Sequence, residues 1–123
     1  MGDTQYHWRL ALENYQGALS ELRAGRYSNV GLLAIKSLEQ AIEACAAREG
    51  LHFHERPWSA HRNRREWLQQ HFPQLIDIWN ELWSIYGTLG YGGIDGRNAR
   101  RAVNLLREAL IVLGRECVGE VHI

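Results

Sequence analysis

Hydrophobic residues recur along most of the chain at spacings of three and four, the repeat of one face of an α-helix. The first such stripe predicts an amphipathic helix over residues 4–24. Its apolar positions are Trp8, Leu12, Tyr15, Leu19 and Leu22. Gly25 interrupts the repeat, and Ser28 can cap a second helix that ends at Gly50. The inward positions of this second helix are Ala34, Leu38, Ala41, Ile42 and Cys45, and its other face carries Lys36, Glu39, Glu43 and Arg48. Lys36 is spaced to pair with Glu39, which is typical of an exposed helix face.

The C-terminal half shows the same repeat twice more. Pro73 suits the first turn of a helix with apolar positions through Leu89, and Asp95 can cap a last helix from Gly96 to Cys117. The inward residues of the last helix are Ala102, Leu106, Ala109, Leu110, Leu113 and Cys117. The stretch between these helices, residues 87–96, contains five glycines and is expected to be a loop or a frayed helix end.

The middle of the chain is polar. Pro57 disfavours helix at Arg56, so "GLHFHERPW" is expected to be an irregular connection. Ser59 then caps a short polar helix through Phe72. No segment alternates with period two, so no sheet is expected. Four main helices and one short helix predict an all-α, antiparallel up-and-down bundle that forms one domain over residues 1–123.

Composition gives little sign of a charged partner. Fourteen basic residues balance fourteen acidic ones, and all the basic residues except Lys36 are arginine. Arginine suits phosphate or carboxylate binding, but it also reflects genome composition. No apolar run is long enough to cross a membrane, and no targeting pattern is present. Cys45 and Cys117 are expected to be inert thiols on apolar helix faces, in a chain of the reducing cytoplasm.

Two stretches carry a resemblance to a known family. One is "YSNVGLLAIKSLEQAIEACAAREG" with the following "ERPWSAH", and the other is "LWSIYGTLGYGGIDGRNARRAVNLLREALIVL". Together they resemble the HEPN superfamily, small helical domains named for higher eukaryotes and prokaryotes nucleotide-binding. The resemblance covers residues 9–113. It implies a homodimer that works beside a nucleotidyltransferase, or a metal-independent ribonuclease of the toxin type that acts on RNA.

In ribonucleases of this superfamily, an arginine is followed four to six residues later by a histidine, and two copies meet across a dimer. Histidine can move a proton while arginine neutralises a phosphate. The candidate catalytic residues here are Arg56 with His61, Arg65 with His71, and Arg64 with His71, the last seven apart on one helix face. These pairs precede the late helix where the family places its motif. At that late position Arg97 is followed by Asn98, but no histidine follows before His122.

Three other constellations are candidate binding sites. Arg97, Arg100 and Arg101 follow glycines at a helix start, where a phosphate or nucleotide could bind, but a solvated arginine face is the simpler explanation. His52, His54 and His61 could ligate zinc, or be solvated loop residues. Trp58 and Trp67 lie in polar surroundings and are candidates for exposed contacts, whereas Trp79 and Trp83 fit a core stripe.

The interpretation we favour is a cytoplasmic HEPN-like domain that acts as a non-catalytic binding or partner module. It is expected to need no cofactor and no metal, and to have no membrane partner. The ribonuclease using an Arg/His pair across a dimer is the alternative.

Overall fold

The computed structural model describes residues 2–92, 95–119, 121 and 123, and these residues contain helices and no strand. The predicted all-α class is therefore confirmed. The α-helices are α1 (Gly2–Ala24), α2 (Tyr27–Ala47), α3 (Pro57–His71), α4 (Ile76–Gly92) and α5 (Gly96–Cys117). Two 3-10 turns, η1 (Phe53–Glu55) and η2 (Pro73–Leu75), lie on either side of α3. Within this described part of the chain, no helix combines the length and apolarity that a bilayer crossing requires.

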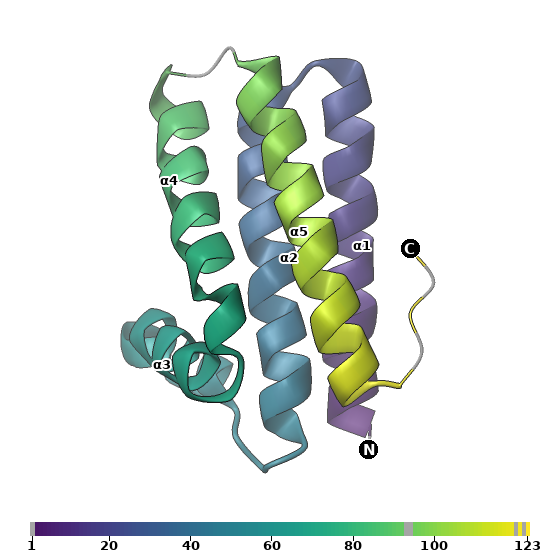
Figure 1. The fold of residues 1–123 in the computed structure, drawn as a ribbon, viewed down its shortest axis with the longest axis vertical. Helices are drawn as coiled ribbons and strands as arrows, with labels where there is room; N and C mark the ends of the chain where they lie inside the picture. Colours follow the sequence, from purple (N-terminus) through teal and green to yellow (C-terminus); the bar gives the residue numbers. More distant parts are fainter. Residues whose placement is uncertain (1, 93–94, 120, 122) are drawn as a thin grey trace.

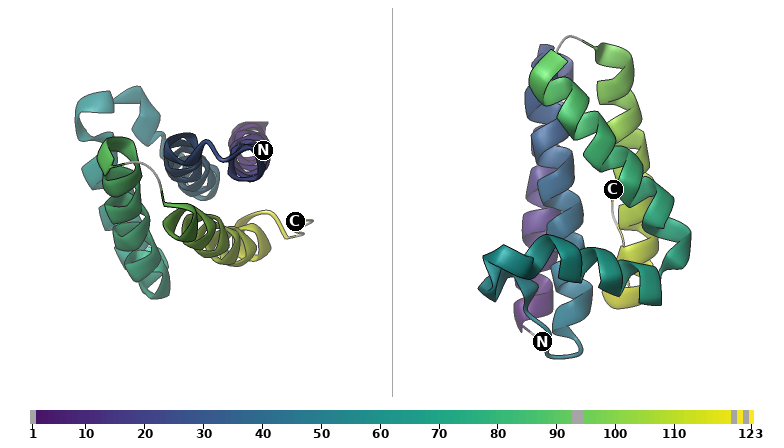
Figure 2. Two further views of the ribbon diagram at one scale, coloured as in Figure 1. Left: turned by 90° about the horizontal axis from the view of Figure 1, so that it is seen from above. Right: turned by 90° about the vertical axis from the view of Figure 1, so that its left-hand side faces the viewer.

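The four long helices lie side by side, and α3 lies across one end of them (Figures 1 and 2). Successive long helices run in opposite directions (Figure 1). Helix α2 contacts α1, α4 and α5, so it is the central element of the core. Helix α3 contacts α2 and α4 as well as the two 3-10 turns. This crosswise helix covers a part of α2 that α1, α4 and α5 leave open.

The core is made from the inward stripes that the hydrophobic repeat predicts. The inward residues of α5 from Ala102 to Leu113 are buried, and so are Leu38 and Ile42 of α2. Trp79 of α4 is the largest side chain that is fully buried. Trp83 is half-buried and packs against the same cluster, so the predicted core role of both tryptophans of α4 is confirmed.

Several predicted helix ends are confirmed. Gly25 and Gly50 have φ angles of 76° and 77°, a left-handed conformation that side chains disfavour. Helix α1 ends directly before Gly25, and α2 ends at Ala47, three residues before Gly50. Asp95 caps α5, because its carboxylate accepts hydrogen bonds from the backbone N–H groups of Arg97 and Asn98. Pro73 lies in the short turn η2 that leads into α4.

Two predicted caps are wrong. Helix α2 begins at Tyr27, before Ser28, and its N-cap residue Arg26 makes no side-chain capping bond. The hydroxyl of Tyr27 packs closely against Gly96 at the start of α5, since a Cβ atom added to Gly96 would lie only 2.9 Å from it. This packing fixes the position of Tyr27. Helix α3 begins at Pro57, two residues before Ser59, since the fixed φ of proline suits a first helical position.

The glycine-rich stretch after Gly87 is more regular than expected. Helix α4 continues to Gly92, so most of the predicted loop is helical. Ile85 is buried and Tyr86 packs against the core directly before this stretch, so the helix is anchored where the glycines begin. Gly93 and Ile94 lie outside the described residues.

Cys45 and Cys117 form a disulfide, so the prediction of two free thiols is wrong. Both cysteines lie on inward faces, as the repeat predicts, but α2 and α5 pack together and bring these faces to the same place. Their Cα atoms are 5.2 Å apart although 72 positions separate them in the sequence. The bond therefore joins the central helix to the last one.

Breaking this disulfide should lower the free energy of unfolding by about 2–4 kcal/mol, because the bond restricts a long loop in the unfolded chain. Urea unfolding with and without a reductant measures the difference. The Cys45→Ala/Cys117→Ala variant is the control: it should resemble the reduced wild type and be insensitive to reductant. Equal stability of the oxidised and reduced wild type would contradict the prediction.

Candidate functional site

The polar face of α2 is buried under α3. Glu43 is only 1% exposed and Glu39 only 7%, whereas the spacing of Lys36 and Glu39 suggested an exposed helix face. Arg64 of α3 explains this correction, because its guanidinium lies between the two carboxylates. Helix α3 thus brings a positive charge to two carboxylates, whose burial would be too costly without a paired cation.

Every oxygen of the two carboxylates has a partner. Arg64 donates from Nε to Oε2 of Glu43 at 2.9 Å and from Nη1 to Oε2 of Glu39 at 3.1 Å. Lys36 pairs with the other oxygen of Glu39 at 3.4 Å, as its spacing predicts. His54 donates from Nδ1 to the other oxygen of Glu43 at 3.0 Å. The network is therefore saturated, which the burial of charged oxygens requires.

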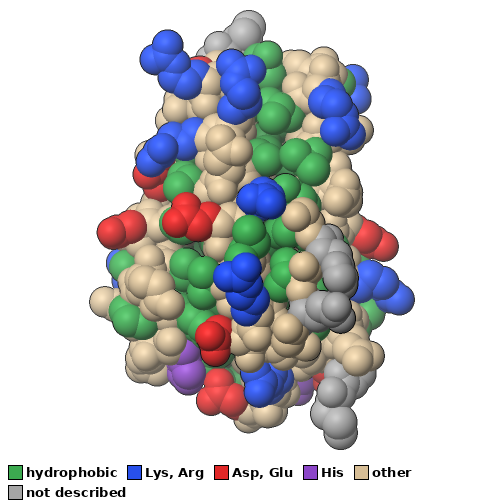
Figure 3. All heavy atoms as spheres, turned by 45° about the vertical axis from the view of Figure 1, so that its right-hand side comes forward, with side chains coloured by type: hydrophobic (Ala, Val, Ile, Leu, Met, Phe, Trp, Pro, Cys, Tyr) green, Lys and Arg blue, Asp and Glu red, His purple; other side chains and the backbone are tan. Residues whose placement is uncertain are grey.

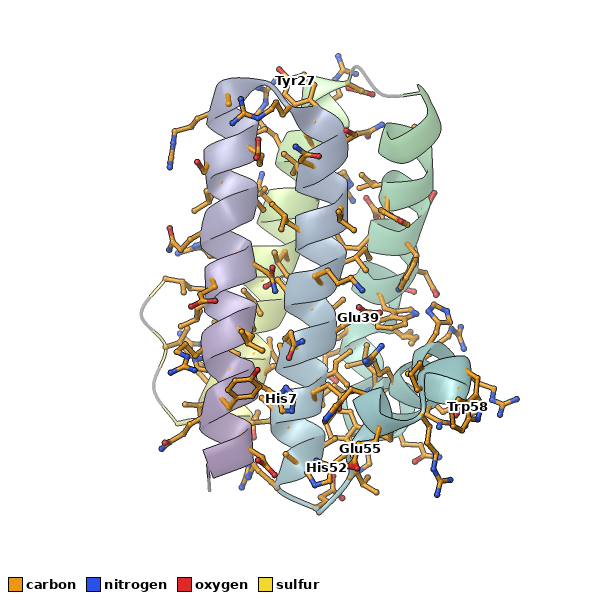
Figure 4. The ribbon with its side chains drawn as sticks, turned by 180° about the vertical axis from the view of Figure 1, so that it is seen from behind. His7, Tyr27, Glu39, His52, Glu55 and Trp58 are labelled. Carbon is orange, nitrogen blue, oxygen red and sulfur yellow. A yellow bond between two sulfur atoms is a disulfide. The ribbon has the colours of Figure 1, made fainter. Side chains whose placement is uncertain are left out.

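Histidines surround the Glu43 end of this network. His7 of α1 is 6% exposed, and its Nδ1 lies 2.7 Å from Oε1 of Gln40. Its ring centre is 4.9 Å from that of His54, and the His54 centre is 6.0 Å from that of His52. The figure from behind shows His7 facing α2, with His52 and Glu55 near the same end of that helix (Figure 4).

These side chains offer one group that could hold a metal ion. His7, Glu43 and His54 each place a ligand atom within 4.8 Å of the others. This group shares only His54 with the zinc set suggested by the sequence. His52 lies nearby and faces Asp3 across 3.9 Å, but His61 lies elsewhere, against the rings of Trp79 and Trp83. The connection expected to be irregular contains the short turn η1 at residues 53–55.

Among the Arg/His pairs considered as catalytic, Arg64 and His71 each make hydrogen bonds to other residues. No hydrogen bond or ion pair between described residues joins Arg64 to His71, Arg65 to His71, or Arg56 to His61. Arg64 is occupied by Glu39 and Glu43. His71 stacks on Trp67 with ring centres 4.4 Å apart and donates from Nδ1 to the Trp67 carbonyl oxygen at 2.9 Å.

The remaining members of these pairs lie nearer the surface. Arg56 and His61 are exposed, and Arg65 is half-buried. Trp79 and Trp83 fix the position of His61 by ring contacts at 5.3 and 4.6 Å. No hydrogen bond between the described residues of one chain holds any of these pairs together.

Arg97, Arg100 and Arg101 line a hollow of about 500 Å³ on α5, but the backbone N–H groups at the start of this helix are not free for an anion. Its first N–H groups already bind the carboxylate of Asp95, which also repels an anion. Arg101 donates two hydrogen bonds to Glu81. This hydrogen bonding lowers the pKa of the Glu81 carboxyl and raises the pKa of the Arg101 guanidinium. Arg97 and Arg100 are exposed. Basic side chains on the face in Figure 3 are dispersed among acidic and apolar ones.

The two tryptophans of α3 have opposite environments. Trp58 is 83% exposed, which confirms it as a surface residue. Trp67 is 5% exposed and donates from Nε1 to Glu49 at 3.0 Å, so its predicted exposure is wrong. Trp67 lies on the side of α3 that faces the core, where a polar neighbourhood in the sequence does not prevent burial.

Sequence reasoning missed His7, Gln40 and Glu43 as parts of one cluster. A sequence signal for His7 was present: Ala11 and Tyr15 follow it at spacings of four and eight, so His7 lies in line with apolar positions of α1, and both of these residues are buried. Glu43 gave no such signal, because its partners His54 and Arg64 lie on other elements.

Comparison with protein-family models, curated proteins and solved structures found no match to this chain. The resemblance to HEPN domains, the homodimer and the nucleotidyltransferase partner therefore stay predictions. Functional conclusions rest on the side chains themselves.

Replacing Arg64 with methionine should destabilise the fold by about 3–5 kcal/mol, because it leaves two buried carboxylates without their shared cation. Urea unfolding measures this loss. The matched control is Arg62→Met on the exposed side of α3, expected within about 0.5 kcal/mol of wild type.

Should Arg64→Met fail to fold, the Glu39→Gln/Glu43→Gln/Arg64→Met variant still tests the same interaction. Removing all three charges together should recover part of the stability lost in the single variant. Equal stability of Arg64→Met and Arg62→Met would contradict the structural role of Arg64.

Proposed function

We propose that this chain is a HEPN-like antiparallel bundle that acts as a non-catalytic binding module, as a homodimer and beside a nucleotidyltransferase. The observation that carries a binding role is the exposure of Trp58. Tryptophan is enriched among the residues that dominate protein interfaces, because it combines a large apolar ring with a polar N–H group.

The surroundings of Trp58 suit a protein partner. The side chain is in the first turn of α3 and points away from the other helices (Figure 4). Arg56 and Arg62 are exposed on the same end of the helix. A tryptophan anchor with arginines beside it can bury apolar area and pair with acidic groups on a partner. Nucleotide binding by Arg97 and Arg100 is less favoured, because Asp95 occupies the helix start.

The commitment of Arg64 to buried carboxylates supports a non-catalytic role. An arginine that neutralises Glu39 and Glu43 cannot also neutralise a phosphate without exposing them. The ribonuclease alternative retains Arg56 with His61, since both are exposed and neither pairs with a carboxylate among the described residues. A cytoplasmic location stays a prediction, and the disulfide weighs against a strongly reducing compartment.

Trp58→Ala should weaken binding to a small nucleotidyltransferase from the same genome by about tenfold or more, the effect of removing an aromatic anchor. Titration calorimetry with the two purified proteins measures the affinity. Tyr6→Ala is the matched control, because Tyr6 is another exposed aromatic residue but lies on α1. Absence of any complex, or equal affinity of Trp58→Ala and wild type, would count against the proposal.

The purified protein should not cleave a structured RNA in excess EDTA, because no hydrogen bond between described residues joins its Arg/His pairs. A His61→Ala/His71→Ala variant, checked for folding by circular dichroism, is tested beside the wild type. Cleavage that the wild type shows and the variant lacks would establish the ribonuclease alternative instead.

A further inference from the structure

We propose that His7, Glu43 and His54 form a binding site for a divalent transition-metal ion of the zinc class. The three ligands come from α1, α2 and η1, so the fold alone brings them together. This metal site is separate from the binding role proposed for Trp58. It lies on the His54 side of Glu43, whereas Trp58 is on α3.

His7 is prepared as a ligand by its neighbour. The side-chain oxygen of Gln40 accepts the hydrogen bond at 2.7 Å, so Nδ1 of His7 carries the proton and Nε2 keeps its lone pair. A metal-binding histidine commonly has such an outer partner, which fixes the tautomer and the ring orientation. Burial of His7 further restricts the ring.

Glu43 supplies a negative oxygen at a suitable distance from His54. Arg64 holds Oε2 of Glu43, and this leaves Oε1 directed at Nδ1 of His54, 3.0 Å away. Two ligands that each lie about 2.0–2.2 Å from one ion are roughly 3.0–3.5 Å apart. A metal ion bound by both atoms would replace the proton that they share, and this proton would pass to solvent.

The site is open to solvent on the side of His54. A hollow of about 190 Å³ is lined by Asp3, Tyr6, His7, His52, His54 and Glu55. Asp3 and Glu55 add negative charge at its rim, and no lysine or arginine of the described residues lines it. A small cation can enter here and gain favourable interactions before it reaches Glu43.

The donor set indicates which ions fit. Two imidazoles and one carboxylate are ligands of zinc and of neighbouring transition metals, whereas calcium and magnesium prefer oxygen alone. Three protein ligands leave a coordination position for water. A bound ion would tie α1 and α2 to η1, the segment that leads into α3 and its exposed Trp58.

Zinc titration of the full chain tests the site. The untagged protein is stripped with EDTA, dialysed, and kept oxidised so that Cys45 and Cys117 offer no thiolate. Calorimetry should show one zinc ion per chain, and His54→Ala should bind it at least about tenfold more weakly. His54 is exposed, so its loss should not unfold the chain. The control, His71→Ala, removes another exposed histidine and should bind as the wild type does.

Thermal unfolding separates metal binding from a folding defect. Saturating zinc should raise the Tm of the wild type and of His71→Ala, but not that of His54→Ala. Saturable binding lost only in His54→Ala supports the site. No saturable binding by the wild type, or equal binding by wild type and His54→Ala, would overturn it.

Discussion

The position of α3 depends on one guanidinium. Helix α3 is short and polar, and it buries few residues of its own, namely Ala60, Trp67 and Leu68. Arg64 adds the interaction that makes its contact with α2 specific, because Glu39 and Glu43 can be buried only when a cation lies between them. Any other placement of α3 would leave these carboxylates either in water or unpaired. The surface position of Trp58 follows from this placement, since it lies on the same helix.

The hydrophobic repeat predicts the helices because burial of one face is a local, periodic property. It does not predict their ends equally well. Asp95 could be identified as a cap because a carboxylate at that position bonds the next N–H groups directly. Ser28 and Ser59 have the same chemistry, but α2 starts at Tyr27, whose hydroxyl lies against Gly96, and α3 starts at Pro57. Long-range packing and proline geometry decide those two ends.

The candidate site could not be predicted because its contacts are distant in sequence. Arg64 is 21 and 25 residues from the glutamates that it joins, and the bonded cysteines are 72 apart. Periodicity shows which residues share a face of a helix, but it does not show what covers that face. Lys36 and Glu39 have the spacing of a solvated pair, and they do make that contact. The error was to infer exposure from it.

Glu43 connects the structural and the chemical parts of the molecule. One of its oxygens accepts a hydrogen bond from Arg64, and the other accepts one from His54, which lines the hollow beside His7. A carboxylate without Arg64 would resist burial, and one without a partner at the surface could not meet a cation from solvent. The same residue can therefore help to hold α3 and remain available as a ligand, because its two oxygens point to different neighbours. Arg64 has no such freedom, since both carboxylates require it.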